Sequence, residues 1–177
     1  MVQIGIGGEE VSTIIPKNQM TEEDIKLNYI TPALLDRGWK DKIPMETKVQ
    51  FTDGKVNIKG NIISREPAKK ADYILYINAN NPIAVVEAKD NHHTVSYGLQ
   101  QAMSYAVTMD IPFAYSSNGD AFYEHDFLTG LEREIPLDAF PTPDELIGRW
   151  RAAKGFTDEQ MPVIDAPYYF DAYTHEP

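Results

Sequence analysis

Two apolar runs separated by a short turn-forming segment constrain the fold of this chain more than any other feature. The first run covers residues 73–77, the second covers residues 83–86, and the segment 78–81 between them is rich in asparagine. Short apolar runs bounded by Asn and Pro indicate buried strands. Because so few residues separate them, the two runs are expected to pair as an antiparallel hairpin within a sheet.

The register of this hairpin predicts that two carboxylates meet. If the turn is centred between residues 79 and 80, Ile74 lies opposite Val85, and Asp72 lies opposite Glu87 with Cβ atoms roughly 5 Å apart. Like charges across a ladder repel, and apolar neighbours make the repulsion worse. A hard divalent cation such as Mg²⁺, which typically binds one or two carboxylates, is the natural compensating partner.

Lys89 follows Glu87 at a spacing of two residues. Side chains at i and i+2 of a strand share a face, so the ammonium group is expected beside the carboxylates. There it could stabilise negative charge that develops on a phosphate group. A simpler interpretation remains open, in which Glu87 and Lys89 form a surface pair at a strand end and Asp72 is a charge near a turn.

Several longer segments resemble one known family. They are residues 71–76, 82–89, 98–106 and 117–119, with agreement in the flanking residues 21–39 and 140–150. Together they resemble the N-terminal nuclease domain of the restriction (R) subunit of type I restriction-modification enzymes. That domain belongs to the PD-(D/E)xK nuclease superfamily. The resemblance spans roughly residues 20–170, so it does not depend on a single motif.

The resemblance implies a role for each residue of the central motif. Asp72 matches the acidic residue of its first half, with Ala71 where the superfamily name has proline. Glu87 and Lys89 match its E-x-K half. The expected Mg²⁺ ligands are Asp72, Glu87 and the carbonyl of Ala88.

Residues on two helices are implied as further parts of the site. Gln101 and Tyr105 match the Q-x-x-x-Y element of this nuclease branch, and Glu22 or the adjacent Glu23 matches an acidic residue of the first helix. From spacing alone, Tyr97, Gln101 and Tyr105 recur every four residues and share a helix face. That face could equally be a partly buried aromatic edge of the core.

The family implies an α/β fold with a central mixed sheet flanked by helices. It also implies Mg²⁺-dependent hydrolysis of double-stranded DNA without sequence choice, after translocation by an ATP-driven motor that this chain does not contain. Modification and specificity subunits would be the partners. We expect an arm or short strand at 1–20, the nuclease domain at 21–155, and an extended arm at 156–177 leading toward the motor. The alternatives are a free-standing repair or restriction nuclease of the same superfamily, and a non-catalytic docking domain.

Composition limits these possibilities. The chain of 177 residues has no cysteine, which excludes disulfides and thiolate metal sites and fits a reducing cytoplasm. No segment has the length of a membrane span, so we expect a cytoplasmic protein with no membrane partner. The formal net charge of −11 argues against strong DNA binding by this chain alone, since Lys and Arg contacts supply most non-specific affinity. DNA would then have to be delivered by another module.

Local patterns predict the remaining elements. Helices are expected at 22–37, with a kink at Pro32 or a break after Ile30, and at 96–109 and 143–154. Strands are expected near 47–51, 56–63, 113–116 and 121–124. The helix at 143–154 has the best local signal, because Thr142 and Glu145 form a capping box and Gly155 follows its end.

Overall fold

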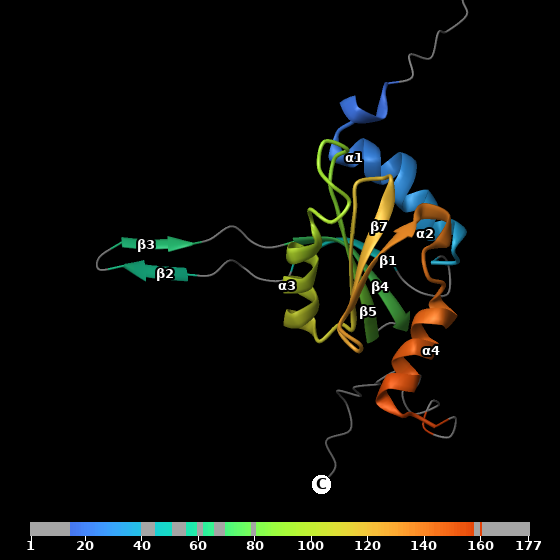
Figure 1. Ribbon diagram of the computed structural model, residues 1–177. Helices are drawn as coiled ribbons and strands as arrows, with labels where there is room; N and C mark the ends of the chain where they lie inside the picture. Colours follow the sequence, from blue (N-terminus) through green and yellow to red (C-terminus); the bar gives the residue numbers. More distant parts are fainter. Residues whose placement is uncertain are drawn as a thin grey trace, which may run out of the picture.

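A six-stranded mixed sheet forms the centre of the fold (Figure 1). The computed structural model describes residues 15–39, 45–50, 56–59, 62–65, 70–78, 81–157 and 160. The strands follow the order β1 (Met45–Gln50), β4 (Lys70–Asn78), β5 (Asn81–Ala88), β6 (Phe113–Ser117), β7 (Ala121–Asp126) and β8 (Leu131–Pro136). Only the β5–β6 pair among them is parallel. The predicted α/β class with a mixed sheet is confirmed, whereas most of the predicted arms at 1–20 and 156–177 lie outside the described residues.

Two further strands pair only with each other. They are β2 (Val56–Lys59) and β3 (Ile62–Arg65), which form an antiparallel two-stranded sheet. The prediction of one strand over residues 56–63 was therefore wrong. Residues 60 and 61 lie outside the described part of the chain, but their types, Gly and Asn, favour a turn and are the sequence signal for two strands in place of one.

The first long helix changes type in its middle. It consists of α1 (Glu22–Ile25), a π-helical turn η2 (Lys26–Ile30) and α2 (Thr31–Asp36). Pro32 occupies the first turn of α2, where its missing N–H and its ring are tolerated. The wider π turn just before it absorbs the proline, so the predicted kink or break is a local change of helical type.

The remaining two helices differ in how they begin and end. The helix α4 (Pro143–Lys154) begins with the predicted capping box of Thr142 and Glu145, and Gly155 ends it with φ +69°. The helix α3 (Leu99–Met109) begins three residues later than predicted, because residues 95–98 form turns. Two short 3₁₀ helices, η1 (Lys17–Gln19) and η3 (Leu137–Ala139), complete the described elements.

Alternate residues of the central strands point to two separate cores. Tyr73 and Leu75 pack in the larger cluster with α1, α2 and α4, while Ile74 and Tyr76 pack in a smaller cluster with α3. Figure 1 shows α3 on one side of the sheet, with α2 and α4 on the other. Since α3 crosses between the parallel strands β5 and β6, one helix covers the face on which Val85 lies.

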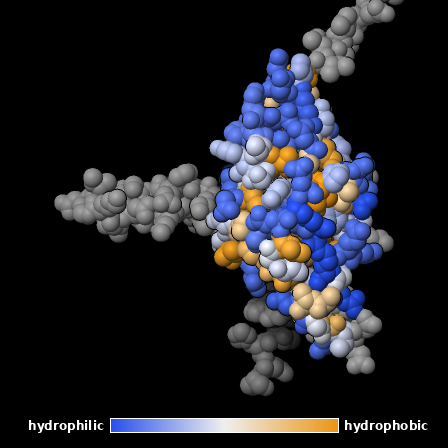
Figure 2. Space-filling model, viewed as in Figure 1, coloured by the Kyte–Doolittle hydropathy of each residue, from blue (hydrophilic) through white to orange (hydrophobic). Residues whose placement is uncertain are grey.

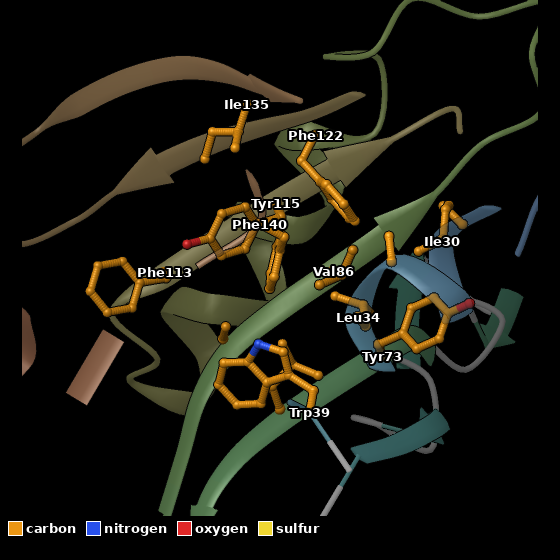
Figure 3. Packing of buried hydrophobic residues seen from close by; sticks show 14 of the residues in the cluster. Ile30, Leu34, Trp39, Tyr73, Val86, Phe113, Tyr115, Phe122, Ile135 and Phe140 are labelled. Carbon is orange, nitrogen blue, oxygen red and sulfur yellow. The ribbon is translucent and has the colours of Figure 1, made fainter. Parts of the chain in front are cut away.

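Aromatic rings fill the larger core (Figure 3). The ring of Phe140 lies 4.5 Å from that of Phe122, 4.7 Å from that of Tyr115 and 6.4 Å from that of Trp39, measured between centroids. The indole N–H of Trp39 donates to the carbonyl of Pro141 at 2.8 Å. This bond joins the end of the first helix to the start of α4, about one hundred residues later.

The surface is of mixed polarity. In the view of Figure 2, the upper part of the molecule, where α1 lies in Figure 1, is mostly hydrophilic, and hydrophobic side chains gather lower down around α3. On α3, the side chain of Val107 is 69% exposed. Within the described part of the chain, no helix combines the length and the apolar character needed to cross a membrane.

Candidate active site

The hairpin of β4 and β5 has the register that the sequence predicts. Ile74 pairs with Val85 and Tyr73 pairs with Val86 in antiparallel fashion. One step further along this register, Asp72 lies beside Glu87. Glu87 is two residues from Val85, so it points to the face of the sheet that α3 covers.

Both oxygens of Asp72 accept hydrogen bonds. The ammonium group of Lys26 donates to Oδ1 at 2.8 Å, and the backbone N–H of Ala88 donates to Oδ2 at 2.9 Å. The side chain is 15% exposed. Asp72 is therefore held in a fixed orientation by one group from the first helix and one from β5.

Glu87 is more deeply buried than Asp72 and has fewer partners. Its Oε1 accepts a hydrogen bond from the ammonium of Lys89 at 2.7 Å, while its buried Oε2 has no hydrogen-bond partner. Burial, and then the negative charge of Asp72, raise the pKa of Glu87 to about 7, although Lys89 acts in the opposite direction. The two carboxylates thus lie close enough to repel each other, as the sequence predicts.

Lys89 also approaches Glu22 of α1, with 3.8 Å between Nζ and Oε2. Burial alone lowers the pKa of Lys89, but the hydrogen bond to Glu87 and the negative charges of Glu87, Glu22 and Asp72 together outweigh it, so the net shift is upward and the ammonium stays protonated. Burial raises the pKa of Glu22, against the charge of Lys89. The neighbouring Glu23 pairs with Lys26 instead, at 3.2 Å. Of the two acidic residues, Glu22 is therefore the one beside the E-x-K strand.

Two of the three residues predicted to share a face of α3 come together. The amide Nε2 of Gln101 donates to the hydroxyl of Tyr105 at 2.9 Å, and Tyr105 is only 4% exposed. Burial, and to a smaller extent the charges of Glu87 and Asp72, raise the pKa of Tyr105. Tyr97 differs, because it precedes the helix, is 60% exposed and stacks on the ring of His93.

Sequence reasoning gave no role to Gly98 and Ser116, which support Glu87 directly. Ser116 pairs with Glu87 across the β5–β6 ladder, and its hydroxyl accepts from the N–H of Gly98 at 2.9 Å. A Cβ at position 98 would lie 2.9 Å from Cγ of Glu87. Only glycine allows this close approach without a shift of Glu87, and a glycine just before a helix is the signal that could have revealed it.

Lys26 was also missed. Its position beside Ile25, in a helix with one buried face, was the only signal in the sequence, because its partner Asp72 lies 46 residues away. A buried lysine is rarely found without a paired charge, and here the pair is Asp72.

The side chains present fit a hard divalent cation. Two ammonium groups, of Lys26 and Lys89, stand among four carboxylates, of Glu22, Glu23, Asp72 and Glu87. The buried oxygen of Glu87 without a hydrogen-bond partner has the chemistry of an Mg²⁺ ligand. In the described part of the chain, no three His, Cys, Asp or Glu side chains form a metal-binding group. The expected ligand set has two carboxylates and one backbone carbonyl, so it would not form such a group.

A mixed sheet whose central hairpin carries Asp72 and the Glu87-x-Lys89 motif defines the PD-(D/E)xK, or restriction-endonuclease-like, class of fold. Residues 55–133 match the family described as the type I restriction enzyme R protein N terminus. The chain belongs to this family.

Two relatives agree with this assignment. The chain is 38% identical over 164 residues to the type I restriction enzyme EcoAI endonuclease subunit of Escherichia coli, an alignment that covers 90% of the chain and 20% of that subunit. A solved fragment assigned as an HsdR subunit of a type I restriction enzyme from Vibrio vulnificus YJ016 is 40% identical, with a TM-score of 0.77. That match covers 85% of this chain and 29% of the other. The chain therefore spans about a fifth of the first relative, and both relatives are subunits of type I restriction enzymes.

Proposed function

We propose that this chain is the Mg²⁺-dependent DNA endonuclease domain of a type I restriction-modification enzyme. The observation that carries the proposal is the buried carboxylate of Glu87 beside Asp72, with Lys89 bonded to Glu87 and one oxygen of Glu87 without a partner. A carboxylate whose charged form is destabilised by burial in an apolar strand indicates a functional site.

Each residue of the central motif has a distinct task in the proposed reaction. Asp72, Glu87 and the carbonyl of Ala88 would hold the Mg²⁺ ion. When bound, Mg²⁺ supplies Lewis-acid chemistry, which polarises a phosphodiester and makes a water molecule more acidic. The protonated ammonium of Lys89, fixed by Glu87 at 2.7 Å, would stabilise the negative charge that develops on the phosphate.

The helix residues would position these groups. Glu22 faces Lys89 from α1 at 3.8 Å and restricts the ammonium on its exposed side. Gln101 and Tyr105, bonded to each other on α3, lie on the face of the sheet that carries Glu87. Neither is a preferred Mg²⁺ ligand, so we assign them to the orientation of Lys89 or of the scissile phosphate.

The activity of the whole enzyme is part of the same proposal. Double-stranded DNA would be brought to the site by an ATP-driven motor outside this chain, and cut without sequence choice by this domain. Modification and specificity subunits would supply methylation and target recognition. The net charge of −11 supports this division, because the chain has little electrostatic affinity for DNA of its own.

Metal-induced stabilisation tests the site without any need for the motor. Mg²⁺ or Mn²⁺ should raise the Tm of the wild-type chain at concentrations above its dissociation constant, because a ligand that binds only the folded state stabilises it. Asp72→Ala should lose this response, and Asp138→Ala, a change at an exposed carboxylate outside the site, should keep it. An equal shift in the wild type and Asp72→Ala would remove Asp72 from the site, and no shift in any of the three proteins would contradict a metal-dependent domain.

In a full-length enzyme with its partner subunits, Asp72→Ala should abolish DNA cleavage while ATP hydrolysis persists.

A further inference from the structure

Lys26 has an unusual position for a lysine. Its side chain is only 7% exposed, and its ammonium lies 2.8 Å from Oδ1 of Asp72 and 3.2 Å from Oε1 of Glu23. It begins the π-helical turn, a kind of helix irregularity that occurs frequently at functional sites. No role in the reaction proposed above depends on it.

The ammonium of Lys26 neutralises Asp72 from inside the protein. Burial alone lowers the pKa of Lys26, but the hydrogen bonds to Asp72 and Glu23 and the charges of both carboxylates together outweigh it, and the net shift is upward. The other oxygen of Asp72 accepts from the N–H of Ala88, so each oxygen of this carboxylate already has a donor, and the donor at Oδ1 is the charged one. A divalent ion that uses Asp72 as a ligand would meet this ammonium group at the same carboxylate.

Two cations cannot share one carboxylate oxygen at close range without strong repulsion. The Coulomb repulsion between two cations grows as their separation and the effective dielectric constant fall, and a divalent ion doubles the repulsion that a monovalent ion would exert on the ammonium group. Lys26 has a second acceptor within reach, because Glu23 is already at 3.2 Å and its side chain is 62% exposed. The ammonium can therefore leave Asp72 for a more solvated partner one turn away.

We propose that Lys26 is an internal counter-cation that a divalent metal displaces from Asp72, with Glu23 as its alternative partner. Lys26 is then a positioning residue that holds Asp72 in its orientation before the metal binds, and it sets the metal affinity of the site. This inference rests on the metal-dependent function proposed above.

Amine labelling of the wild-type chain tests the displacement directly. A lysine-acylating reagent followed by mass spectrometry should modify Lys26 slowly in EDTA and severalfold faster in saturating Mn²⁺, because the ammonium moves toward solvent. Lys17 is the internal control, since it pairs with Asp120 outside the site and its labelling should not change. If Mn²⁺ leaves Lys26 labelling unchanged or slows it, while binding is detected by calorimetry, displacement is excluded.

Metal titration of variants supplies the second readout. Lys26→Met removes the competing charge at similar length, and should tighten Mn²⁺ binding by about tenfold. Lys17→Met, which removes one charge near the same helix, should leave the affinity at the wild-type value. Unchanged or weaker binding by folded Lys26→Met would overturn the inference and leave the proposed function intact. If the wild type itself binds no metal, the proposed function and this inference both fail. Should Lys26→Met not fold, the labelling of the wild type decides.

Discussion

Glu87 and Glu124 are two buried glutamates of the same sheet, yet their environments have opposite effects on them. Glu87 is 3% exposed and Glu124 is 1% exposed. The pKa of Glu87 is raised to about 7, whereas the pKa of Glu124 is lowered below its ordinary value although burial opposes this. Since residue type and burial are matched, the difference comes from the groups that face each carboxylate.

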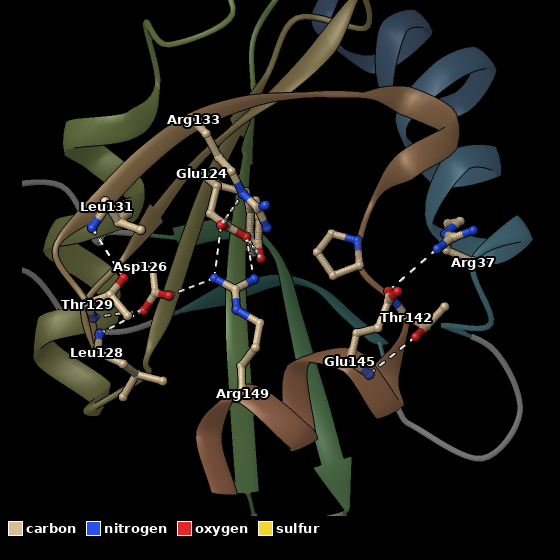
Figure 4. Close-up of polar contacts among 12 residues, drawn as sticks. Arg37, Glu124, Asp126, Leu128, Thr129, Leu131, Arg133, Thr142, Glu145 and Arg149 are labelled. Carbon is tan, nitrogen blue, oxygen red and sulfur yellow. Dashed lines mark hydrogen bonds and ion pairs between the residues drawn. The ribbon is translucent and has the colours of Figure 1, made fainter. Parts of the chain in front are cut away.

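Glu124 has a complete set of cationic and neutral donors (Figure 4). The guanidinium of Arg149 donates to both of its oxygens at 2.9 Å, and Nε of Arg133 donates to Oε1 at 2.9 Å. The hydroxyl of Tyr115 donates to Oε2. Arg149 also bonds to Asp126 at 2.7 Å and thereby joins α4 to β7. A bidentate arginine is among the strongest partners that a carboxylate has in proteins.

Glu87 has one ammonium group, an acidic neighbour and an oxygen without a partner. A cluster that serves only stability would be expected to satisfy such a buried oxygen, as the Glu124 cluster does. The contrast teaches that burial of a carboxylate does not reveal its purpose. The donors around the carboxylate are more informative. They distinguish Glu124, which anchors α4, from Glu87, whose surroundings are suited to bind a cation.

The largest effect expected in a test of this comparison is the loss of stability when Arg149 is replaced. Arg149→Met should lower the free energy of unfolding by about 3–5 kcal/mol, because the buried carboxylates of Glu124 and Asp126 would lose their main cationic partner. Arg133→Met is the matched control. The Arg133 side chain is 57% exposed, so its loss should cost less than about 1 kcal/mol. Urea unfolding of both variants measures the difference, and equal losses would show that the Glu124 cluster does not depend on the bidentate contact.

The second effect concerns the pH dependence that Glu87 gives to the metal-free protein. A folded pKa of about 7, above the ordinary 4.5, means that the folded state holds the proton more tightly. This contribution is present at low pH and is lost as the pH rises through 7. The free energy of unfolding in EDTA should therefore fall by about 2.5 kcal/mol between pH 5 and pH 8 through Glu87.

Glu87→Gln isolates that contribution. Most of the fall should disappear in this variant, and a smaller part should remain because the pKa of Glu22 is also raised. Glu124 should act in the other direction: its lowered pKa means that its contribution is lost as the pH falls. Urea unfolding at pH 5 and pH 8 compares the wild type with Glu87→Gln. An identical pH dependence in both would show that folding does not raise the pKa of Glu87.

The parts of the site that the sequence predicts are those that depend on strand geometry. Asp72, Glu87 and Lys89 could be placed together because the period of a strand and a short hairpin determine their register. Helix α4 could be delimited because its capping box and terminal glycine are local signals. In each case the interacting residues are close in sequence, or are related by a regular repeat.

The parts that were missed depend on contacts between distant segments. Lys26 meets Asp72 across 46 residues, and Arg149 meets Glu124 across 25 residues, with no repeat that relates either pair. Strand β8 was missed for a different reason. It lies at the edge of the sheet, only Ile135 among its six residues is buried, and its sequence therefore lacks an alternating pattern.

The smallest expected effect on stability, and one that sharpens the comparison, is at Gln101 and Tyr105. If these residues position groups for the reaction, Gln101→Ala should reduce DNA cleavage by roughly tenfold or more in a full-length enzyme with its partner subunits. Metal-induced stabilisation and ATP-driven translocation should persist, and the free energy of unfolding should change by less than about 1 kcal/mol, because Gln101 is exposed. Gln100→Ala, at the exposed neighbouring position, should cut at the wild-type rate.

Tyr105→Phe keeps the buried ring and removes only the hydroxyl that accepts from Gln101, so it should be milder than Tyr105→Ala if packing is the main contribution of Tyr105. Wild-type cleavage by both alanine variants would mean that this face of α3 belongs to the core alone, and that the site consists of the strand residues and Glu22.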